Sequence, residues 1–238
     1  ENKKQVILFQ NRRGYSPIMS CGTCAYTPNC NSCDVSLTFH KWNNQLKCHY
    51  CGYTEQVPEV CPSCTAKDFS DKGFGTEQIE ESLKELLPYY VTKRMDYDTT
   101  RGKNAHQQII TDFEQGRIDI LVGTQMVTKG LDFDNVALVG ILNADSMLHF
   151  PDFRAYERSF QMMAQVSGRS GRSEKQGKVI IQTYTPLHNT IQQVTRNDYD
   201  SMFKEQLIER EIYKYPPYYK LIKLTLKHRD FEKLKDEI

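Results

Sequence analysis

Apolar residues in this chain of 238 residues gather in short runs, separated by polar stretches with helical spacing. Runs of about four to eight apolar and β-branched residues predict buried strands. Such runs occur at 6–9, 91–95, 118–122, 136–142 and 179–183. Apolar residues three and four positions apart predict helices at 76–87, 105–114, 154–167 and 188–210. This alternation predicts an α/β fold, with a parallel sheet covered by helices on both faces.

The first predicted helix carries signals for both of its ends. Its apolar positions are Ile79, Leu83, Leu86 and Leu87. Pro88 ends the helix, because proline lacks the N–H that the next turn needs. Thr76 is the expected N-cap, since its hydroxyl can accept a hydrogen bond from a backbone N–H of the first turn. The residue three positions later is Ile79, so a capping box that starts at Thr76 is absent.

The strand and helix pattern is interrupted once, by a segment rich in Asn, Gly, Pro, Ser and Cys. The expected divisions are 1–15 (first strand of the α/β domain), 16–68 (cysteine-rich insertion), 69–215 (remainder of that domain) and 216–238 (start of a truncated C-terminal domain). The turn Tyr215-Pro216-Pro217-Tyr218 suggests the last boundary. The chain starts almost directly on a strand and stops within an expected helix, so we interpret it as a piece of a longer protein.

The composition indicates a globular chain without a strong overall charge. Hydrophobic residues make up 39%, charged residues make up 26%, and the formal net charge is +1. No global basic field therefore attracts nucleic acid, and any contact with it must come from local patches or backbone groups. No run of about 18 apolar residues occurs, so we expect no membrane-spanning helix. The charged start does not resemble a signal peptide, and we expect a cytoplasmic location.

All eight cysteines lie between residues 21 and 64, in four CxxC pairs. The pairs are Cys21/Cys24, Cys30/Cys33, Cys48/Cys51 and Cys61/Cys64. Two zinc ions, each held by four thiolates, fit this pattern better than a disulfide framework, because secreted disulfide domains rarely arrange every cysteine as CxxC. Four sulfur ligands leave no position for water, so we expect structural rather than catalytic zinc.

Four pairs can be shared between two metals in three ways. The two inner pairs have 14 residues between them, which is close to the zinc-ribbon spacing. Residues 38–41 and 45–47 predict the hairpin that joins the two halves of such a ribbon. This favours a nested arrangement, with Cys21, Cys24, Cys61 and Cys64 in one site and Cys30, Cys33, Cys48 and Cys51 in the other. His49 is expected to face solvent, since the thiolates fill both sites.

A second candidate site is the segment Gln165-Val166-Ser167-Gly168-Arg169-Ser170-Gly171-Arg172. Arg169 and Arg172 lie three positions apart at the end of a predicted helix and can share a face. The glycines beside them let another surface approach closely. Two guanidinium groups suit the charge of a transferring γ-phosphate. An isolated pair would be better explained as solvated arginines at a helix C-terminus, where cations are favoured.

The strand at 118–122 and the turn after it favour the phosphate-binding interpretation of the arginine pair over that of solvated arginines. The strand leads into Thr124 and Gln125, and then into a polar turn that contains Gly130 and Asp132. Ligands of open α/β sheets bind beyond the carboxyl ends of the strands, and this segment occupies that position. We therefore expect the arginine pair to reach the same strand-end crevice. Residues 121–133 resemble motif V of superfamily 2 helicases, and 165–172 resemble motif VI with its arginine fingers.

Further motifs indicate which family of superfamily 2 helicases the sequence resembles. They are 11–15 ahead of the four CxxC pairs, 73–78, 96–100 and 151–158. With this order and spacing, residues 5–218 resemble the PriA family of replication-restart DNA helicases. The resemblance implies a RecA-like second helicase lobe, with a small zinc-ribbon-like insertion that binds two zinc ions in the nested pairing.

The resemblance also implies an activity for the full-length protein. It would be a 3′→5′ DNA helicase that uses ATP and Mg²⁺, recognises stalled forks and takes part in primosome assembly. Its expected partners are branched forks, single-stranded DNA, primosome proteins and single-stranded DNA-binding protein. Its expected location is the bacterial cytoplasm, in association with the nucleoid, and no membrane is implied.

Carried over position by position, the resemblance gives individual residues a role. Arg169 and Arg172 would contact the ATP phosphates. Residues expected near the nucleotide are Gly130, Asp132 and Gln165. Residues expected at the DNA backbone are Thr124, Gln125, Gly75, Thr76 and Arg12. The charged residues of 151–158 are equally well explained by a solvated ion-pair network.

The sequence lacks a phosphate-cradling GxxxxGK[ST] loop and an acidic Mg²⁺ site. The resemblance places both in a first lobe, N-terminal to Glu1, so we predict that this chain alone does not hydrolyse ATP. Two other functional classes stay open. A zinc-ribbon module on an inert scaffold could bind DNA or primosome proteins, but it leaves the two phosphate-type motifs without a role. A zinc redox protein would require reactive thiols.

Overall fold

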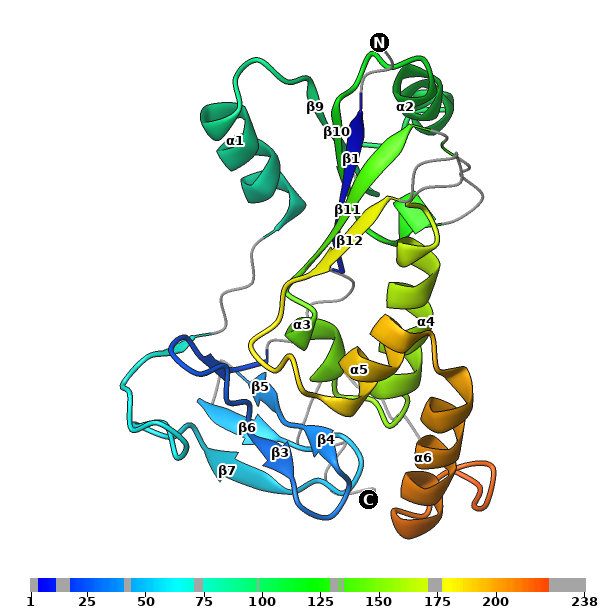
Figure 1. Ribbon diagram of the computed structural model, residues 1–238. Helices are drawn as coiled ribbons and strands as arrows, with labels where there is room; N and C mark the ends of the chain where they lie inside the picture. The colour runs from blue at the N-terminus through cyan, green and yellow to red at the C-terminus, as the bar shows by residue number, and fades with distance from the viewer. Residues whose placement is uncertain are drawn as a thin grey trace.

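The computed structural model describes residues 4–11, 18–40, 44–70, 75–97, 99–128, 133, 135–170 and 177–222. One sheet with helices forms the larger part of the molecule, and the cysteine-rich segment lies beyond one end of its strands (Figure 1). No helix in these ranges is both long and apolar enough to pass through a lipid bilayer. The expected divisions near residues 16, 69 and 216 stay predictions, and residues 223–238 lie outside the described ranges.

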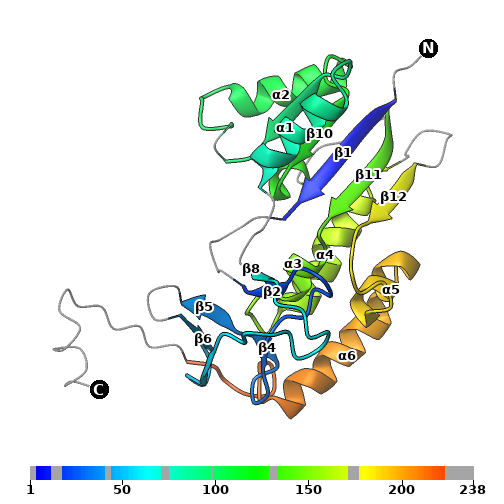
Figure 2. The same cartoon turned by 90° about the vertical axis from the view of Figure 1, so that its left-hand side faces the viewer.

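The central sheet has five parallel strands in the order β12-β11-β1-β10-β9. Their bounds are Gln5–Gln10 (β1), Thr92–Met95 (β9), Ile120–Gly123 (β10), Val136–Leu142 (β11) and Lys178–Ile181 (β12). β1 lies in the middle, where Ile7 pairs with Leu121 on one side and with Val139 on the other. The carboxyl ends of the strands form one edge, which faces the cysteine-rich segment (Figure 2). The predicted parallel sheet is confirmed.

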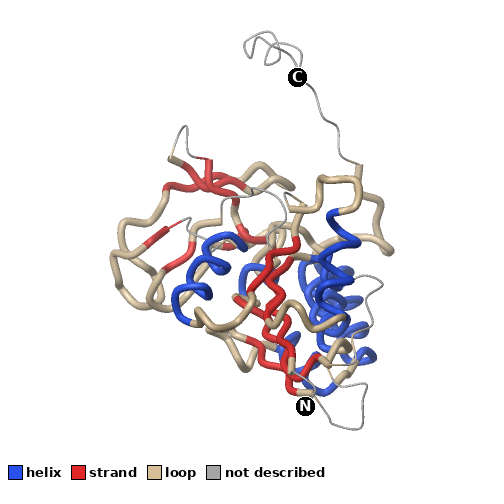
Figure 3. Tube along the Cα trace, turned by 90° about the horizontal axis from the view of Figure 1, so that it is seen from above, coloured by secondary structure: helices blue, strands red, loops and turns tan. Residues whose placement is uncertain are grey.

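Helices cover both faces of this sheet. The helices of the described residues are α1 (Thr76–Leu86), α2 (Ala105–Glu114), η1 (Gln125–Thr128), α3 (Asp145–Leu148), α4 (Ala155–Ser167), α5 (Asn189–Arg196) and α6 (Tyr199–Ile212), of which α5 and α6 pack on α4. α1 packs on β9 and β10 from one side, whereas α2 and α4 lie on the other side (Figure 1). Seen from above, the strands run between helices on either side (Figure 3). The predicted three-layer architecture is therefore confirmed.

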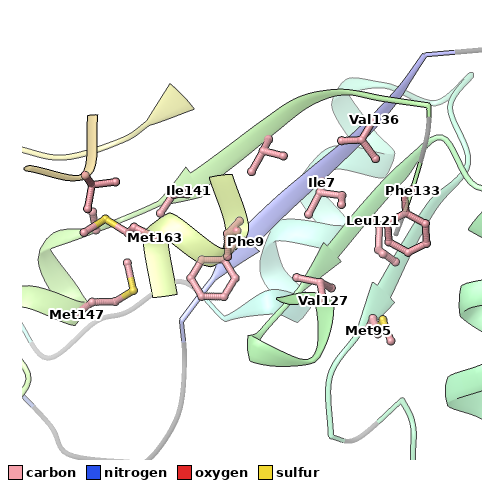
Figure 4. Packing of buried hydrophobic residues seen from close by; sticks show 14 of the residues in the cluster. Ile7, Phe9, Met95, Leu121, Val127, Phe133, Val136, Ile141, Met147 and Met163 are labelled. Atoms are coloured by element: carbon pink, nitrogen blue, oxygen red, sulfur yellow. The ribbon is translucent and has the colours of Figure 1, made fainter. Parts of the chain in front are cut away.

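The main core lies between the sheet and the layer that contains α2 and α4 (Figure 4). Ile7 and Phe9, on the same face of β1, have no exposed surface. Burial of side chains of this size contributes roughly 1.5–3 kcal/mol each. The side-chain amide of Gln5 is also buried, and its Nε2 donates to Phe113 O and Ile118 O, both at 2.7 Å. The central strand thus enters the core with that polar group paired.

The start of α1 differs from the expectation. Gly75, in an extended conformation with φ −80° and ψ 158°, is the N-cap. Its N–H donates to Gln78 Oε1 at 3.2 Å, so one half of a capping box is present when the count starts from Gly75. Thr76 is the first residue of the helix itself, and its hydroxyl donates to Asp96 Oδ2 at 2.7 Å. The prediction of Thr76 as N-cap was wrong because the helix begins one residue earlier than expected.

The long helix expected at 188–210 is two helices. Asn197, with φ 54°, takes the left-handed conformation and ends α5. Asp198 Oδ1 then accepts from the N–H of Ser201 at 3.0 Å and caps α6. Asn tolerates the left-handed backbone and Asp is a favoured N-cap, so this Asn-Asp pair suits such a break. The prediction of one helix was wrong because apolar spacing alone does not record a change of direction.

Between β1 and α1 the chain forms three small sheets. β2 (Ser20–Cys21) pairs with β8 (Phe69–Ser70), β3 (Asn29–Cys30) pairs with β4 (Val35–Ser36), and β5 (Thr38–His40), β6 (Gln45–Lys47) and β7 (Thr54–Gln56) form a three-stranded sheet. The predicted hairpin is confirmed, since Phe39 pairs with Leu46. Among the described residues of this region, the buried core cluster consists of Met19, Cys30, Val35, Leu37, Leu46 and Cys48. Its stability therefore depends on the cysteines.

Candidate functional site

Each of the four CxxC pairs forms the same tight turn. The residue after the second cysteine donates its N–H to the carbonyl of the first: Ala25 to Cys21 (2.9 Å), Asp34 to Cys30 (2.9 Å), Gly52 to Cys48 (3.1 Å) and Thr65 to Cys61 (2.8 Å). That residue has a positive φ in every pair, at 59° in Ala25, 49° in Asp34, 78° in Gly52 and 63° in Thr65. Three of the four are not glycine, so each adopts a conformation that L residues ordinarily avoid. Because the same unfavourable turn occurs in all four pairs, the four turns are expected to have the same structural role.

The turns bring the thiols together in two groups of four. We name Cys21, Cys24, Cys61 and Cys64 the outer cluster, and Cys30, Cys33, Cys48 and Cys51 the inner cluster. Within each cluster, the sulfur atoms all lie within 4.8 Å of one another. The Sγ atoms of Cys21 and Cys64 are 3.6 Å apart, and those of Cys30 and Cys51 are 3.5 Å apart. A tetrahedral Zn²⁺ with Zn–S bonds of about 2.3 Å places its sulfurs about 3.8 Å apart, so both clusters fit this ion.

The two clusters contain the same sets of cysteines as the nested arrangement expected from spacing. His49, between two cysteines of the inner cluster, is exposed and lies outside both groups. Its ring packs instead near that of His40, at 5.3 Å between centroids. Four thiols in each cluster complete a tetrahedral set, so the geometry suits a closed structural site.

Three aromatic side chains hold the inner cluster against the α/β domain. Phe153 and Tyr215 stack with their ring centroids 4.7 Å apart, and Tyr50 meets both rings nearly edge-on, at 6.4 and 5.6 Å. Tyr215 Oη donates to Cys33 O at 2.8 Å, so this contact reaches a turn of the cluster itself. Sequence reasoning missed these residues, because they lie far apart in the chain and no spacing rule relates them.

Charged residues of 151–158 form ion pairs beside this aromatic group. Arg154 Nη2 lies 3.3 Å from Glu157 Oε1, and Arg158 Nη1 lies 2.8 Å from Asp152 Oδ2. Glu157 also pairs with Arg210 of α6. Burial favours a higher pKa for the Glu157 carboxyl, but hydrogen bonds and charges from Arg154 and Arg210 outweigh it and lower the pKa below its ordinary value. These contacts favour the ion-pair interpretation of this motif.

Asp96, directly after β9, is the centre of a polar cluster at the carboxyl edge of the sheet. Its carboxylate accepts from Thr76 Oγ1 at 2.7 Å and from the N–H of Thr99 at 3.1 Å, and it lies 3.4 Å from Arg94 Nε. Its carbonyl accepts from Thr100 Oγ1 at 2.6 Å. Burial alone would raise the pKa of the Asp96 carboxyl, but these hydrogen bonds and the Arg94 charge lower it below its ordinary value. An ionised Asp96 therefore ties the start of α1 to the loop after β9.

The turn after β10 joins the same edge. The N–H of Thr124 donates to Met95 O at 3.4 Å, and Thr100 Oγ1 donates to Met126 Sδ at 3.5 Å. Thr124 is only 9% exposed. Of the residues expected at the DNA backbone, the structure brings together Gly75, Thr76, Thr124 and Gln125.

Close packing shapes this turn. A Cβ at Gly123 would lie 2.7 Å from Met95 O and 2.3 Å from a methyl group of Val127, so no side chain fits there. The Gln125 side chain turns toward α4, where its Nε2 lies 2.8 Å from Met162 Sδ. Gln125 is therefore anchored to the helical layer, while the backbone around Thr124 stays at the sheet edge.

Arg169 lies at the far end of α4. Because α4 follows β11 and precedes the parallel strand β12, it has to run against the strands. Met163 packs beside Phe9 and Ile141, near the carboxyl ends of their strands (Figure 4). Arg169 comes two residues after the end of α4 at Ser167. The expectation that the arginine pair reaches the strand-end crevice stays a prediction.

The other residues expected at the nucleotide are only partly described. Gln165 is exposed on α4, one turn before Arg169, which is half-buried. The N–H of Arg169 donates to Val166 O at 3.0 Å, so its backbone forms a turn directly after the helix. Arg172, Gly130 and Asp132 lie outside the described residues, as does Arg12 from the expected DNA contacts. Their roles stay predictions.

Two family profiles match separate parts of the chain. Residues 30–56 match the PriA DNA helicase Cys-rich region (CRR) domain, and residues 65–174 match the Helicase conserved C-terminal domain. The chain is 49% identical over 230 residues to the replication restart protein PriA of Bacillus subtilis (strain 168), and 48% identical over 226 residues to that of Synechocystis sp.. These alignments cover 97% and 93% of this chain, but only 29% and 27% of the relatives.

The chain thus spans less than a third of the length of these relatives. Among solved structures, S. cerevisiae Dbp5 bound to RNA and ADP BeF3 is 18% identical to it, with a TM-score of 0.37. That similarity covers 58% of this chain and 35% of the Dbp5 chain. A likeness this distant carries no argument about function.

Proposed function

Because this chain belongs to the PriA family of replication restart proteins, we propose that it forms the second motor lobe and the zinc-binding region of an ATP-dependent 3′→5′ DNA helicase that restarts stalled replication forks. One observation carries the proposal. A parallel helicase-type sheet and two four-cysteine clusters occur in one chain, with the clusters between the first strand and α1. The whole protein would act on branched forks and single-stranded DNA at the nucleoid, together with primosome proteins and single-stranded DNA-binding protein.

The zinc region is proposed as a rigid platform. Each cluster would hold one Zn²⁺ through four thiolates, and the ion would supply cross-links between turns rather than chemistry. The aromatic contact of Tyr50, Phe153 and Tyr215 would then fix the inner half of this platform on the motor lobe. The platform faces the carboxyl edge of the sheet, and this is also the edge where we propose that DNA binds.

Arg169 and Arg172 are proposed as the arginine fingers of the motor. ATP and Mg²⁺ would be held mainly by the other lobe, and these guanidinium groups would balance the charge on the γ-phosphate. Arg169 lies directly after α4, so it would move with the whole lobe when the two lobes close. Gly130, Asp132 and Gln165 would border the nucleotide.

The strand-end cluster around Asp96 is proposed as the contact with the DNA backbone. Its donors are the Thr124 region, the first-turn N–H groups of α1 that follow Gly75 and Thr76, and Arg12 by resemblance. The start of a helix suits a phosphate, because N–H groups point outward there. A chain with a net charge of +1 needs such local donors, since its overall field does not attract DNA.

The test uses the whole protein with Arg169→Ala or Arg172→Ala, and Arg196→Ala, exposed at the end of α5, as the control. Each finger variant should lose DNA-stimulated ATP hydrolysis by roughly 10³-fold or more, together with fork unwinding. Binding of single-stranded DNA should persist, and the control should retain every activity. Unimpaired ATP hydrolysis and unwinding by both finger variants would overturn the assignment of the arginine fingers. Absence of unwinding by the unsubstituted whole protein would instead favour a zinc-ribbon module that binds DNA or primosome proteins without a motor role.

A further inference from the structure

An aromatic and cationic pair stands on the loop after β9. Tyr97 directly follows Asp96, and its side chain is 74% exposed. The guanidinium of Arg101 lies over the Tyr97 ring, 5.0 Å from its centroid. Lys103 is exposed on the same loop. None of the roles proposed above uses Tyr97, Arg101 or Lys103.

The backbone on both sides of Tyr97 is held firmly. Asp96 is buried, and it accepts hydrogen bonds from Thr99 and Thr100 on the far side of Tyr97. Thr100 in turn contacts Met126 in the turn after β10. An exposed ring on an anchored backbone loses little conformational freedom when a ligand binds to it.

Tyr97 differs from the exposed Tyr89 in the edge of the sheet at which it lies. Tyr89 is 95% exposed, but it precedes β9 and so lies at the amino edge of the sheet. Tyr97 lies at the carboxyl edge, one residue from the cluster that joins Thr76 to the turn of Thr124. Tyr97 therefore lies directly beside the cluster where we propose that the DNA backbone binds.

We propose that Tyr97 is a stacking platform for a base of single-stranded DNA, with Arg101 on one face of the ring and the base on the other. Aromatic rings stack with every base, because all bases present a π face, so the contact suits a motor that moves along any sequence. The Arg101 charge favours the pair through its attraction to the ring, and Arg101 and Lys103 favour the nearby phosphates. This inference rests on the proposed DNA contact and adds a contact to the base.

The experiment separates base contacts from phosphate contacts. The whole protein is titrated with a single-stranded oligothymidylate and with an abasic oligonucleotide of the same length, which carries the same phosphates. The variants are Tyr97→Ala and Tyr97→Phe, and Tyr89→Ala is the matched control. Tyr97→Ala should raise the Kd for the oligothymidylate by at least about fivefold, and leave the Kd for the abasic strand unchanged. Tyr97→Phe should restore binding, because the ring is retained.

Each alternative result has its own meaning. Equal effects of Tyr97→Ala on both oligonucleotides, or no effect on either, would overturn the stacking platform while leaving the proposed DNA contact in place. An equal loss in Tyr97→Ala and Tyr89→Ala would also overturn it. No binding of either oligonucleotide by the unsubstituted protein would overturn the proposed function, and the stacking platform with it.

A second readout follows the base directly. A 2-aminopurine placed in the oligonucleotide loses fluorescence when it stacks on a ring. The unsubstituted protein and Tyr97→Phe should quench it at saturation, while Tyr97→Ala at saturation should quench it less. Equal quenching by all three proteins at saturation would overturn the stacking platform.

Discussion

Thr76 and Asp96 are joined by a hydrogen bond of 2.7 Å, although 20 residues separate them in sequence. The bond links the first residue of α1 to the residue that follows β9. A helix on one face of the sheet and a loop at its carboxyl edge are therefore held together through one buried carboxylate. Both elements belong to the surface where we propose that DNA binds.

Thr76→Val should weaken the contact between α1 and the loop after β9. Valine has a similar shape but no hydroxyl, so Asp96 loses a donor in a buried place, at a cost of about 1–3 kcal/mol. Hydrogen–deuterium exchange in the whole protein should show faster exchange in α1 and in the loop after β9. Thr195→Val, at an exposed hydroxyl in α5, should leave both segments unchanged. Unchanged exchange in Thr76→Val would mean that other contacts of Asp96 suffice.

The Asp96 carboxylate should make stability depend on pH in a defined direction. Its pKa is lower in the folded protein than the value of about 3.9 of an unfolded chain. The contribution to stability is therefore fully present above the unfolded value, and it is lost as the pH falls through the folded value. Urea unfolding should show that the stability gap between the unsubstituted protein and Asp96→Asn is full near neutral pH and shrinks below about pH 4. A gap that widens in acid would contradict this.

The two cysteine clusters should load zinc separately. They share no ligand, so Cys64→Ser should remove the zinc of the outer cluster and leave that of the inner cluster. Metal analysis of the whole protein measures the loss, and Ser63→Ala is the matched neighbour that should retain both ions. Thiol reagents should react only after a chelator is added, because bound thiolates are protected. Rapid reaction without a chelator would favour the zinc redox interpretation.

Tyr215 should hold the inner cluster on the motor lobe by two separable contacts. Tyr215→Phe loses only the hydrogen bond to Cys33 O, which costs about 1 kcal/mol. Tyr215→Ala also loses the ring that stacks on Phe153, and the total should reach about 3–5 kcal/mol. Limited proteolysis of the cysteine-rich region should rank the variants in that order. Tyr219→Phe, at a ring that is 48% exposed, should behave like the unsubstituted protein.

The chain by itself should not hydrolyse ATP. It contains the proposed arginine fingers, but its sequence has no phosphate-cradling loop or acidic Mg²⁺ site. A phosphate-release assay on this chain, with and without single-stranded DNA, checks the expectation, and the whole protein is the positive control. DNA-stimulated turnover by the chain alone would refute the assignment of these parts to another lobe.

Local pattern was enough to predict the strands and the cysteine grouping. The expected bounds 136–142 are those of β11. The run is apolar throughout, and none of its residues is exposed. The inner cluster was expected because the 14 residues between its two pairs are close to the zinc-ribbon spacing, and the thiols are grouped in that way. Helix α2, from Ala105 to Glu114, was likewise predicted with its observed bounds.

Contacts between distant residues could not be predicted in the same way. Thr76 and Asp96 are ordinary residues, and nothing in their neighbours in the sequence indicates that they meet. The same holds for Tyr50, Phe153 and Tyr215, which come from three separate segments. A motif such as that of Arg169 indicates chemistry, but it does not state in which direction its helix runs.

The order of the strands has a consequence for biosynthesis. β1 is synthesised before both of its neighbours, because β10 and β11 begin only at residues 120 and 136. Both cysteine clusters are complete once residue 64 has been made. The metal-binding region can therefore mature while the central strand still has no partner. In a cell short of zinc, the insertion would stay unfolded during this interval, next to a first strand that still lacks its partners, and chaperones would meet both before β10 and β11 have been made.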